Sequence, residues 1–306
     1  MTILVAGATG LIGRRLVQRL IEAGNNVVVL TRNPRKGIGL GSALLRLVQW
    51  DARTPGEWYA ELDGSDAVIN LSGESIGQKR WTPDQKSRIL SSRIDATNAI
   101  VGAIGAAARK PRVLINASAV GYYGDAGDDE LLESHPSGSD FLADVCRQWE
   151  SAAHAAEEFG VRVVLPRSAV VLDAHAGALK RLLLPFRLFI GGPLGRGNQW
   201  FPWIHLEDEV GALQFALQNT AVTGPVNVVA PDLVTMREFC STLGKALARP
   251  SWAPVPELLL KIVLGEMSDM VLKGQRAIPR RLLDAGYRFK FPRLDEALAD
   301  LLKRED

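Results

Sequence analysis

The stretch GATGLIG (Gly7–Gly13) decides the fold class of this chain. It follows an apolar run, Thr2–Ala6, that predicts a strand, and it opens an amphipathic run, Leu11–Ala23, that predicts a helix. Glycines at this spacing allow a sharp turn, close approach of a phosphate to the backbone, and tight packing of the helix. Because a helix N-terminus also offers unpaired N–H groups, the stretch predicts a binding site for the diphosphate of a dinucleotide.

Further strand and helix patterns alternate along the first half of the chain. The predicted strands are apolar on both sides, which is typical of a parallel sheet covered by helices on both faces. Repeated strand–helix units of this kind predict a Rossmann-type doubly wound α/β fold. The strands are predicted at Asn26–Thr31, Arg46–Trp50, Asp66–Leu71, Val113–Ala117 and Arg162–Leu165, and the helices at Pro83–Ala108 and Phe141–Phe159.

Beyond Pro166 the sequence changes in character. Glycine-rich and aromatic loops precede a predicted helix at Asp208–Gln218, and the run VNVV (Val226–Val229) is a candidate strand returning to the sheet. A last amphipathic helix is predicted at Leu294–Lys303. We therefore predict a Rossmann domain over residues 1–166, with a returning strand at 225–230, and a smaller, interleaved C-terminal α+β substrate lobe over residues 167–306.

Composition narrows the class of partner. The 306 residues contain 36 Lys+Arg and 34 Asp+Glu, and a formal net charge of +2 is not the basic excess of a nucleic-acid binder. No stretch approaches the ~20 apolar residues that span a bilayer, and the N-terminus lacks the basic start and cleavage site of a signal peptide. We expect a small-molecule substrate, no nucleic acid and no membrane, and a homo-oligomer stays open.

The cysteines and histidines are few and scattered. Cys146 and Cys240 lie far apart and match no ligand spacing, which favours a reducing, cytoplasmic location. The four histidines show no paired pattern either. We therefore expect no metal site.

The end of the second predicted strand selects the cofactor. An Asp or Glu about 20 residues past the glycine loop binds the ribose 2′-hydroxyl of NAD, whereas an Arg accommodates the 2′-phosphate of NADP. Here the sequence LTRNPRK places Thr31 and Arg32 at that position, with no acidic residue nearby. A guanidinium makes charge-assisted hydrogen bonds to a phosphate, so NADP(H) is predicted. Arg35 and Lys36 either assist or form a solvated turn.

Several longer blocks resemble the extended short-chain dehydrogenase/reductases, and more closely their YfcH-like epimerase-family branch. The resemblance covers essentially the whole chain, including a short family-specific C-terminal domain of unknown function at about 250–303. The blocks are NLSGESI (Asn70–Ile76), RWTPDQKSRILSSRIDAT (Arg80–Thr97), NASAVGYYGD (Asn116–Asp125), DFLADVCRQWE (Asp140–Glu150), GGPLGRGNQWFPWIHLEDEVGA (Gly191–Ala212) and LGEMSDMVLKGQRAIPRRLLDAG (Leu264–Gly286).

The resemblance implies a set of cofactor-binding residues. In the glycine loop they are Gly7, Thr9, Gly10, Leu11, Ile12 and Gly13, and after the fourth strand they are Leu71, Ser72, Gly73 and Glu74. Arg93, in the core of a family block, is the preferred candidate to clasp a phosphate. Arg80 and Arg88 share its helix, where arginines are more often solvated.

The resemblance also implies a catalytic hydroxyl, but the usual acid–base pair is missing. Ser118 matches the hydroxyl that binds the reacting oxygen, with hydrogen bonding to the nearby loop as the alternative. The positions of the Tyr and Lys that exchange protons hold Leu142 and Cys146, or Ala143 and Arg147 in the adjacent register. Tyr122 and Tyr123 lie near Ser118 in sequence and become the substitute candidates, although a phenol without a lysine is a weak base.

Four residues of one block carry open alternatives. Trp200, Phe201 and Trp203 either floor a sugar or nucleobase site or form a hydrophobic seam. His205 follows them and is expected to brace the lobe rather than to catalyse.

Two functions remain from this sequence. The first is an NADP(H)-dependent oxidoreductase, or an enzyme similar to nucleotide-sugar epimerases. It would act on a hydroxyl or carbonyl of a small molecule, either free or nucleotide-linked. The second is a catalytically weak or inactive NADP(H)-binding sensor or scaffold, which would not need the missing Tyr and Lys.

Overall fold

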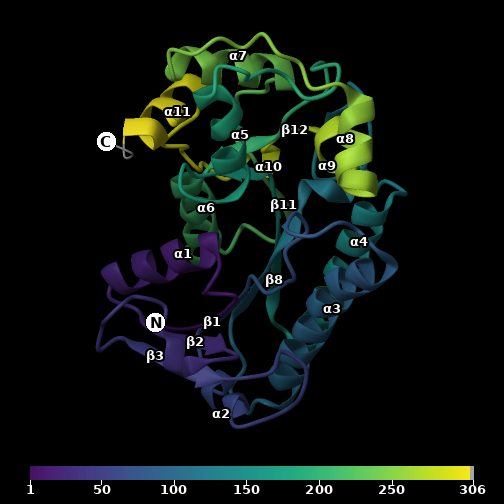
Figure 1. Cartoon of the computed structure of the whole chain (residues 1–306). Helices are drawn as coiled ribbons and strands as arrows, with labels where there is room; N and C mark the ends of the chain where they lie inside the picture. Colours follow the sequence, from purple (N-terminus) through teal and green to yellow (C-terminus); the bar gives the residue numbers. More distant parts are fainter. Residues whose placement is uncertain (304–306) are drawn as a thin grey trace.

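A parallel sheet forms the centre of the protein, whose computed structural model describes residues 1–303 (Figure 1). Its strands follow the order β11-β8-β5-β4-β1-β2-β3, with β6 beside β8. The chain thus leaves β1 in both directions, and the predicted doubly wound α/β fold is confirmed. The strands are β1 (Thr2–Ala6), β2 (Asn26–Thr31), β3 (Leu45–Gln49), β4 (Ala67–Asn70), β5 (Val113–Asn116), β6 (Ser118–Ala119), β8 (Arg162–Ser168) and β11 (Gly224–Val228).

Helices cover both faces of this sheet, as Figure 1 shows. On one face lie α1 (Leu11–Glu22) and α6 (Leu206–Gln218). On the other lie α2 (Trp58–Leu62), α3 (Pro83–Ala106) and α4 (Phe141–His154). The 3₁₀ turns are η1 (Pro34–Lys36), η2 (Val120–Tyr123), η3 (Ala155–Phe159) and η4 (Gly265–Ser268).

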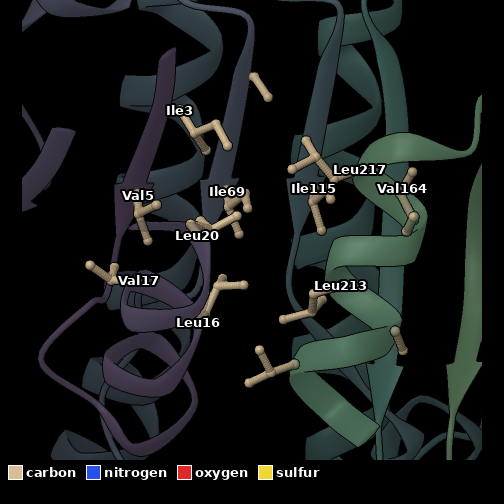
Figure 2. Close-up of a cluster of buried hydrophobic side chains, with 14 of the residues drawn as sticks. Ile3, Val5, Leu16, Val17, Leu20, Ile69, Ile115, Val164, Leu213 and Leu217 are labelled. Atoms are coloured by element: carbon tan, nitrogen blue, oxygen red, sulfur yellow. The ribbon is translucent and has the colours of Figure 1, made fainter. Parts of the chain in front are cut away.

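Alternation along each strand builds two separate cores. Ile3 and Val5 of β1 pack with α1 and α6, whereas Leu4 and Ala6 pack with α3 on the opposite face. Figure 2 shows the first core, where side chains of α1 and α6 meet the strands. Burying one such Ile or Leu stabilises the fold by about 1.5–3 kcal/mol. The two cores hold the carboxyl ends of the strands, where the loops begin, in fixed positions.

Most of the chain after Ser168, apart from α6 and β11, forms a smaller lobe above the sheet in Figure 1, together with residues 130–131. Its core surrounds Phe186, Trp203, Phe239 and Leu298, and its two small sheets pair β9 with β10 and β7 with β12. The elements are β7 (Glu130–Leu131), β9 (Val170–Leu172), α5 (Gly177–Arg187), β10 (Trp203–His205), α7 (Met236–Ala246), α8 (Glu257–Leu264), α9 (Asp269–Leu272), β12 (Arg276–Ala277), α10 (Arg280–Asp284) and α11 (Leu294–Lys303).

Several element boundaries differ by one or more residues from those predicted. The helix predicted over Phe141–Phe159 ends at His154 and continues as a 3₁₀ turn. The helix predicted from Asp208 begins at Leu206, where the His205 side chain accepts a hydrogen bond from the Glu207 N–H. The strand predicted over Arg162–Leu165 runs to Ser168 because β11 pairs along its whole second half, so it crosses residue 166.

Within residues 1–303, no helix combines the length and the apolar character required to cross a membrane.

Candidate functional site

The glycine loop is held in a conformation that requires glycine. Gly7 has φ +80°, and a Cβ atom there would lie 2.5 Å from the carbonyl carbon of Leu71. A Cβ on Gly13 would lie 2.4 Å from the carbonyl oxygen of Gly7. The loop therefore packs against both β4 and its own helix without room for side chains. No side chain caps the N-terminus of α1, and its first turn carries no acidic residue.

A cavity of about 820 Å³ opens beside this loop, and we name it the loop cavity. Its wall combines the glycine loop with the loops that follow β2 and β4. Nine of the predicted cofactor-binding residues line it: Gly7, Thr9, Gly10, Thr31, Arg32, Leu71, Ser72, Gly73 and Glu74. Ile12 and Gly13 lie behind the loop and do not line it.

Cations gather at one end of the loop cavity. Arg32, Lys36 and Arg53 line it, whereas Arg35 does not. The Arg53 guanidinium pairs with Asp95 at 3.0 Å, but Arg32 is exposed and forms no ion pair with any residue that the structure describes. Arg32 is therefore available to an anionic group of a ligand.

A second cavity of about 640 Å³ lies between the carboxyl edge of the sheet and the lobe, and we name it the aromatic cavity. Leu11 and Arg93, both predicted to bind the cofactor, line it. Aromatic side chains supply much of the remaining wall: Trp81, Phe141, Trp149, Trp200 and Phe201. The two cavities meet at the glycine loop, where Gly10 lines the loop cavity and the next residue, Leu11, lines the aromatic cavity.

The three aromatic residues at 200, 201 and 203 divide between a cavity wall and a hydrophobic core, the two alternatives that the sequence left open. Trp200 and Phe201 line the aromatic cavity. Trp203 is buried in the lobe core and donates its indole N–H to the carbonyl oxygen of Asp232. His205 is also buried and stacks on Phe291 at a centroid distance of 4.0 Å.

Ser118 does not line the aromatic cavity, whereas Ala119 does. The Ser118 hydroxyl is buried and donates a hydrogen bond to Oε1 of Glu150 at 2.6 Å. The structure thus places the predicted catalytic Ser118 in the core rather than on the cavity wall.

Tyr122 and Tyr123 belong to the same buried cluster and line neither cavity. The Tyr123 phenol donates to Oδ1 of Asn227 at 2.6 Å and accepts from Nη1 of Arg167 at 3.0 Å. Burial raises its pKa. The Tyr122 ring lies under the Arg167 guanidinium, 3.4 Å from centroid to Cζ. The geometry gives both tyrosines packing partners and no access to a ligand in either cavity.

The positions of the missing Tyr and Lys face the aromatic cavity. Leu142 and Cys146 line it, whereas Ala143 is buried and Arg147 pairs with Asp144 on the surface. Burial raises the pKa of the Cys146 thiol to about 12, so it is not a base at neutral pH. This part of the wall offers no acid–base group.

Sequence reasoning missed a hydroxyl on another wall of the same cavity and a buried carboxyl group bonded to it, which does not itself line the cavity. Ser168, at the end of β8, lines the cavity and donates to Oε1 of Glu209 at 2.7 Å. Glu209 is 1% exposed, and within the described residues its Oε2 has no hydrogen-bond partner. Burial raises the pKa of Glu209 to about 7. The pair can therefore hold or release a proton near neutral pH.

The raised pKa of Glu209 predicts a pH-dependent stability. The fold favours the protonated carboxyl, so this contribution is fully present below the ordinary pKa of glutamate and is lost as pH rises through about 7. We expect Glu209→Gln, relative to the unsubstituted protein, to gain up to about 3 kcal/mol of unfolding free energy between pH 5 and pH 8. Urea unfolding at pH 5 and at pH 8 measures this difference in unfolding free energy, with the exposed Glu158→Gln variant as control. A difference between Glu209→Gln and the unsubstituted protein that is the same at both pH values would contradict the prediction.

Comparison with known proteins places this architecture in a family. Residues 3–229 match the model of the NAD dependent epimerase/dehydratase family, and residues 255–301 match a domain of unknown function, DUF1731. The chain is similar to the epimerase family protein SDR39U1 homolog, chloroplastic, of Arabidopsis thaliana, with 43% identity over 99% of this chain and 87% of that protein. It is similar to the epimerase family protein YfhF of Bacillus subtilis, with 39% identity over 99% and 98% of the two chains.

A solved structure matches over the full length. The crystal structure of human epimerase family protein SDR39U1 (isoform 2) with NADPH superposes with a TM-score of 0.89 and 37% identity, and it covers 99% of both chains. The family model spans well over half of this chain, and the two relatives are themselves named epimerase family proteins. The resemblance seen in the sequence is thus confirmed, and the chain belongs to the NAD dependent epimerase/dehydratase family.

Proposed function

We propose that this protein is an NADP(H)-dependent enzyme that acts on a hydroxyl or carbonyl group of a small molecule. The observation that carries the proposal is the loop cavity, in which the unpaired Arg32 lies beside the glycine loop. The match to human SDR39U1, which was crystallised with NADPH, supports the same cofactor. The aromatic cavity, beginning at Leu11, leaves space for a substrate next to the cofactor.

The residues present fit a phosphorylated dinucleotide. Gly7 and Gly10 leave the backbone of the loop open to a diphosphate, and the uncapped N-terminus of α1 faces it with partial positive charge. Arg32 would hold the 2′-phosphate, and Ser72 and Gly73 would line the adenosine half. When bound, NADPH supplies a hydride for the reduction of a carbonyl.

Ser168 and Glu209 are the proposed proton carriers. The Ser168 hydroxyl, which donates to Glu209 Oε1 at 2.7 Å in this structure, would turn its O–H to the oxygen of a reduced carbonyl and give up that proton. Glu209, protonated on Oε1, would then donate its proton to Ser168 Oγ across the same contact, which leaves the Glu209 carboxylate. A carboxyl with a pKa of about 7 is suited to this exchange at neutral pH. The apolar wall around Leu142 and Cys146 would exclude water from the reacting atoms.

A spectroscopic screen tests turnover directly. Purified protein with NADPH is mixed with aldehydes, ketones, quinones and sugar nucleotides, and nicotinamide absorbance is followed. We expect consumption of NADPH with at least one class, and we expect Ser168→Ala to lower that rate by about tenfold or more because it removes the proton carrier. Ser42→Ala, at a serine outside both cavities, is the matched control. Equal rates for the Ser168→Ala and Ser42→Ala variants would refute the role of Ser168.

A second candidate function is NADP(H) sensing without turnover. It is favoured by Leu142 and Cys146, which line the cavity where the superfamily resemblance implies Tyr and Lys. A sensor of this kind must distinguish the reduced from the oxidised cofactor, because ligand binding stabilises a protein only according to its affinity. Equal affinities for NADPH and NADP⁺, with no turnover in the screen, would argue against this candidate and against the enzyme alike.

A further inference from the structure

One cation on the wall of the aromatic cavity forms no ion pair with the residues that the structure describes. Lys86 pairs with Glu266, and Lys273 pairs with Asp269 at 2.7 Å. Arg93, the third cation on the wall, forms no ion pair with any residue between 1 and 303. Burial lowers the pKa of its guanidinium, although the electrostatic influence of Cys146 and Glu74 raises it in part. A partly buried guanidinium without an ion pair is stabilised by a bound anion.

The Arg93 side chain is fixed in place but keeps donors for a ligand. Its Nη1 donates to the carbonyl oxygens of Glu74 at 3.0 Å and Ile89 at 2.9 Å. The guanidinium also packs against Trp149, 5.0 Å from Cζ to the ring centroid, and a Cβ atom on Gly73 would lie 2.9 Å from Cζ. A guanidinium has five N–H groups, and Nε and Nη2 make no hydrogen bond within the described part of the chain. Those two atoms form the edge that binds a carboxylate through two hydrogen bonds.

The surroundings of Arg93 define the rest of the ligand. Trp81, Phe141 and Trp200 lie on the walls of the same cavity, together with aliphatic residues of β9 and α4. Flat aromatic faces pack well against another aromatic ring. A ligand with an aromatic body and a single negative group therefore matches this cavity better than a neutral sugar, whose hydroxyl groups would meet an apolar wall.

We propose that the aromatic cavity binds a small aromatic monocarboxylate, with its carboxylate on Arg93 and its ring among the tryptophans. The proposal rests on the proposed function in one respect, since NADP(H) is taken to share this cavity at Leu11. The diphosphate of the cofactor is the other possible source of an anion for Arg93. The test therefore measures carboxylate and cofactor separately.

The experiment uses cinnamate and its neutral analogue cinnamamide as probes. Each is titrated calorimetrically into the full chain saturated with NADPH. We expect cinnamate to bind at least about tenfold more tightly than cinnamamide, because only the carboxylate gains charge-assisted hydrogen bonds. Arg93→Gln should abolish the preference and Arg93→Lys should retain part of it. Arg88→Gln, at an exposed arginine of the same helix, should leave it unchanged.

NADPH titrations of the same variants separate the two sources of the anion. The proposal requires that Arg93→Gln bind NADPH within about threefold of the unsubstituted protein. It is overturned if Arg93→Gln loses NADPH affinity about tenfold while the cinnamate preference persists, or if neither probe binds at millimolar concentration. A preference for cinnamate in protein that fails to bind NADPH would support this proposal and contradict the proposed function. Thermal unfolding of each variant shows whether it is folded.

Discussion

Arg167→Met is expected to lower the free energy of unfolding by about 3–5 kcal/mol, because it leaves a buried carboxylate without its partner. Arg167 is 2% exposed and Glu150 is 5% exposed. The guanidinium donates to both carboxylate oxygens, from Nε at 2.9 Å and from Nη2 at 2.8 Å. Methionine retains much of the apolar volume over Tyr122, so the loss is mainly electrostatic. In this variant the Glu150 carboxylate keeps the hydrogen bond from Ser118 and loses both hydrogen bonds from Arg167.

Urea unfolding of single and double variants tests this expectation. The double variant Arg167→Met with Glu150→Leu removes both charges and should be more stable than Arg167→Met alone, since no unpaired charge remains. Arg112→Met is the matched control, because its side chain is 79% exposed and pairs with Asp66 on the surface, where an ion pair contributes about 0–1 kcal/mol. Equal losses from Arg167→Met and Arg112→Met would show that the buried pair is not a stabilising element.

The consequence for the site lies in β6. Ser118 is bonded to Glu150, and the next residue, Ala119, forms part of the aromatic cavity wall. The ion pair therefore positions one side of the cavity from behind. A serine in the family block is better explained here as a structural link to Glu150 than as a group in contact with a ligand in this cavity.

The cofactor half could be predicted from the sequence because its signals are local. The glycine loop follows directly on a strand, and the apolar runs of the strands show their burial without long-range information. The loop cavity then brings together Arg32, at the end of β2, and the residues after β4. Their proximity follows from the parallel sheet, because the carboxyl ends of its strands lie at one edge.

The other half could not be predicted because its decisive contacts join distant residues. Whether position 118 or 119 faces the cavity depends on the phase of a two-residue strand, which has no alternation to read. Ser168 meets Glu209 only because the end of β8 lies against the first turns of α6. Trp200 and Trp203 differ in burial because β10 begins at Trp203 and carries its side chain into the lobe core.

Arg32→Asp is expected to weaken NADPH binding by about a hundredfold, because it places a negative charge beside the dianionic 2′-phosphate in place of a guanidinium. NADH, which carries a hydroxyl group there, should bind with unchanged or improved affinity, since Asp can accept a hydrogen bond from it. Calorimetric titration of both cofactors measures the two affinities. The informative quantity is the ratio of the NADPH affinity to the NADH affinity, because general damage to the glycine loop would weaken the binding of both cofactors alike.

A charge change close to the cavity could weaken NADPH through long-range repulsion alone, and Arg35→Asp controls for this. Arg35 lies three residues further along the same turn but does not line the loop cavity. Repulsion between exposed charges is screened over a Debye length of about 10 Å at 0.1 M salt, so the Arg35→Asp effect should be small and should fade as salt is added. The Arg32→Asp effect should largely persist, because it includes the loss of direct hydrogen bonds to the phosphate. If the two variants lose NADPH equally at high salt, Arg32 is not the 2′-phosphate ligand, and the preference for NADP(H) must come from Lys36 or Arg53 instead.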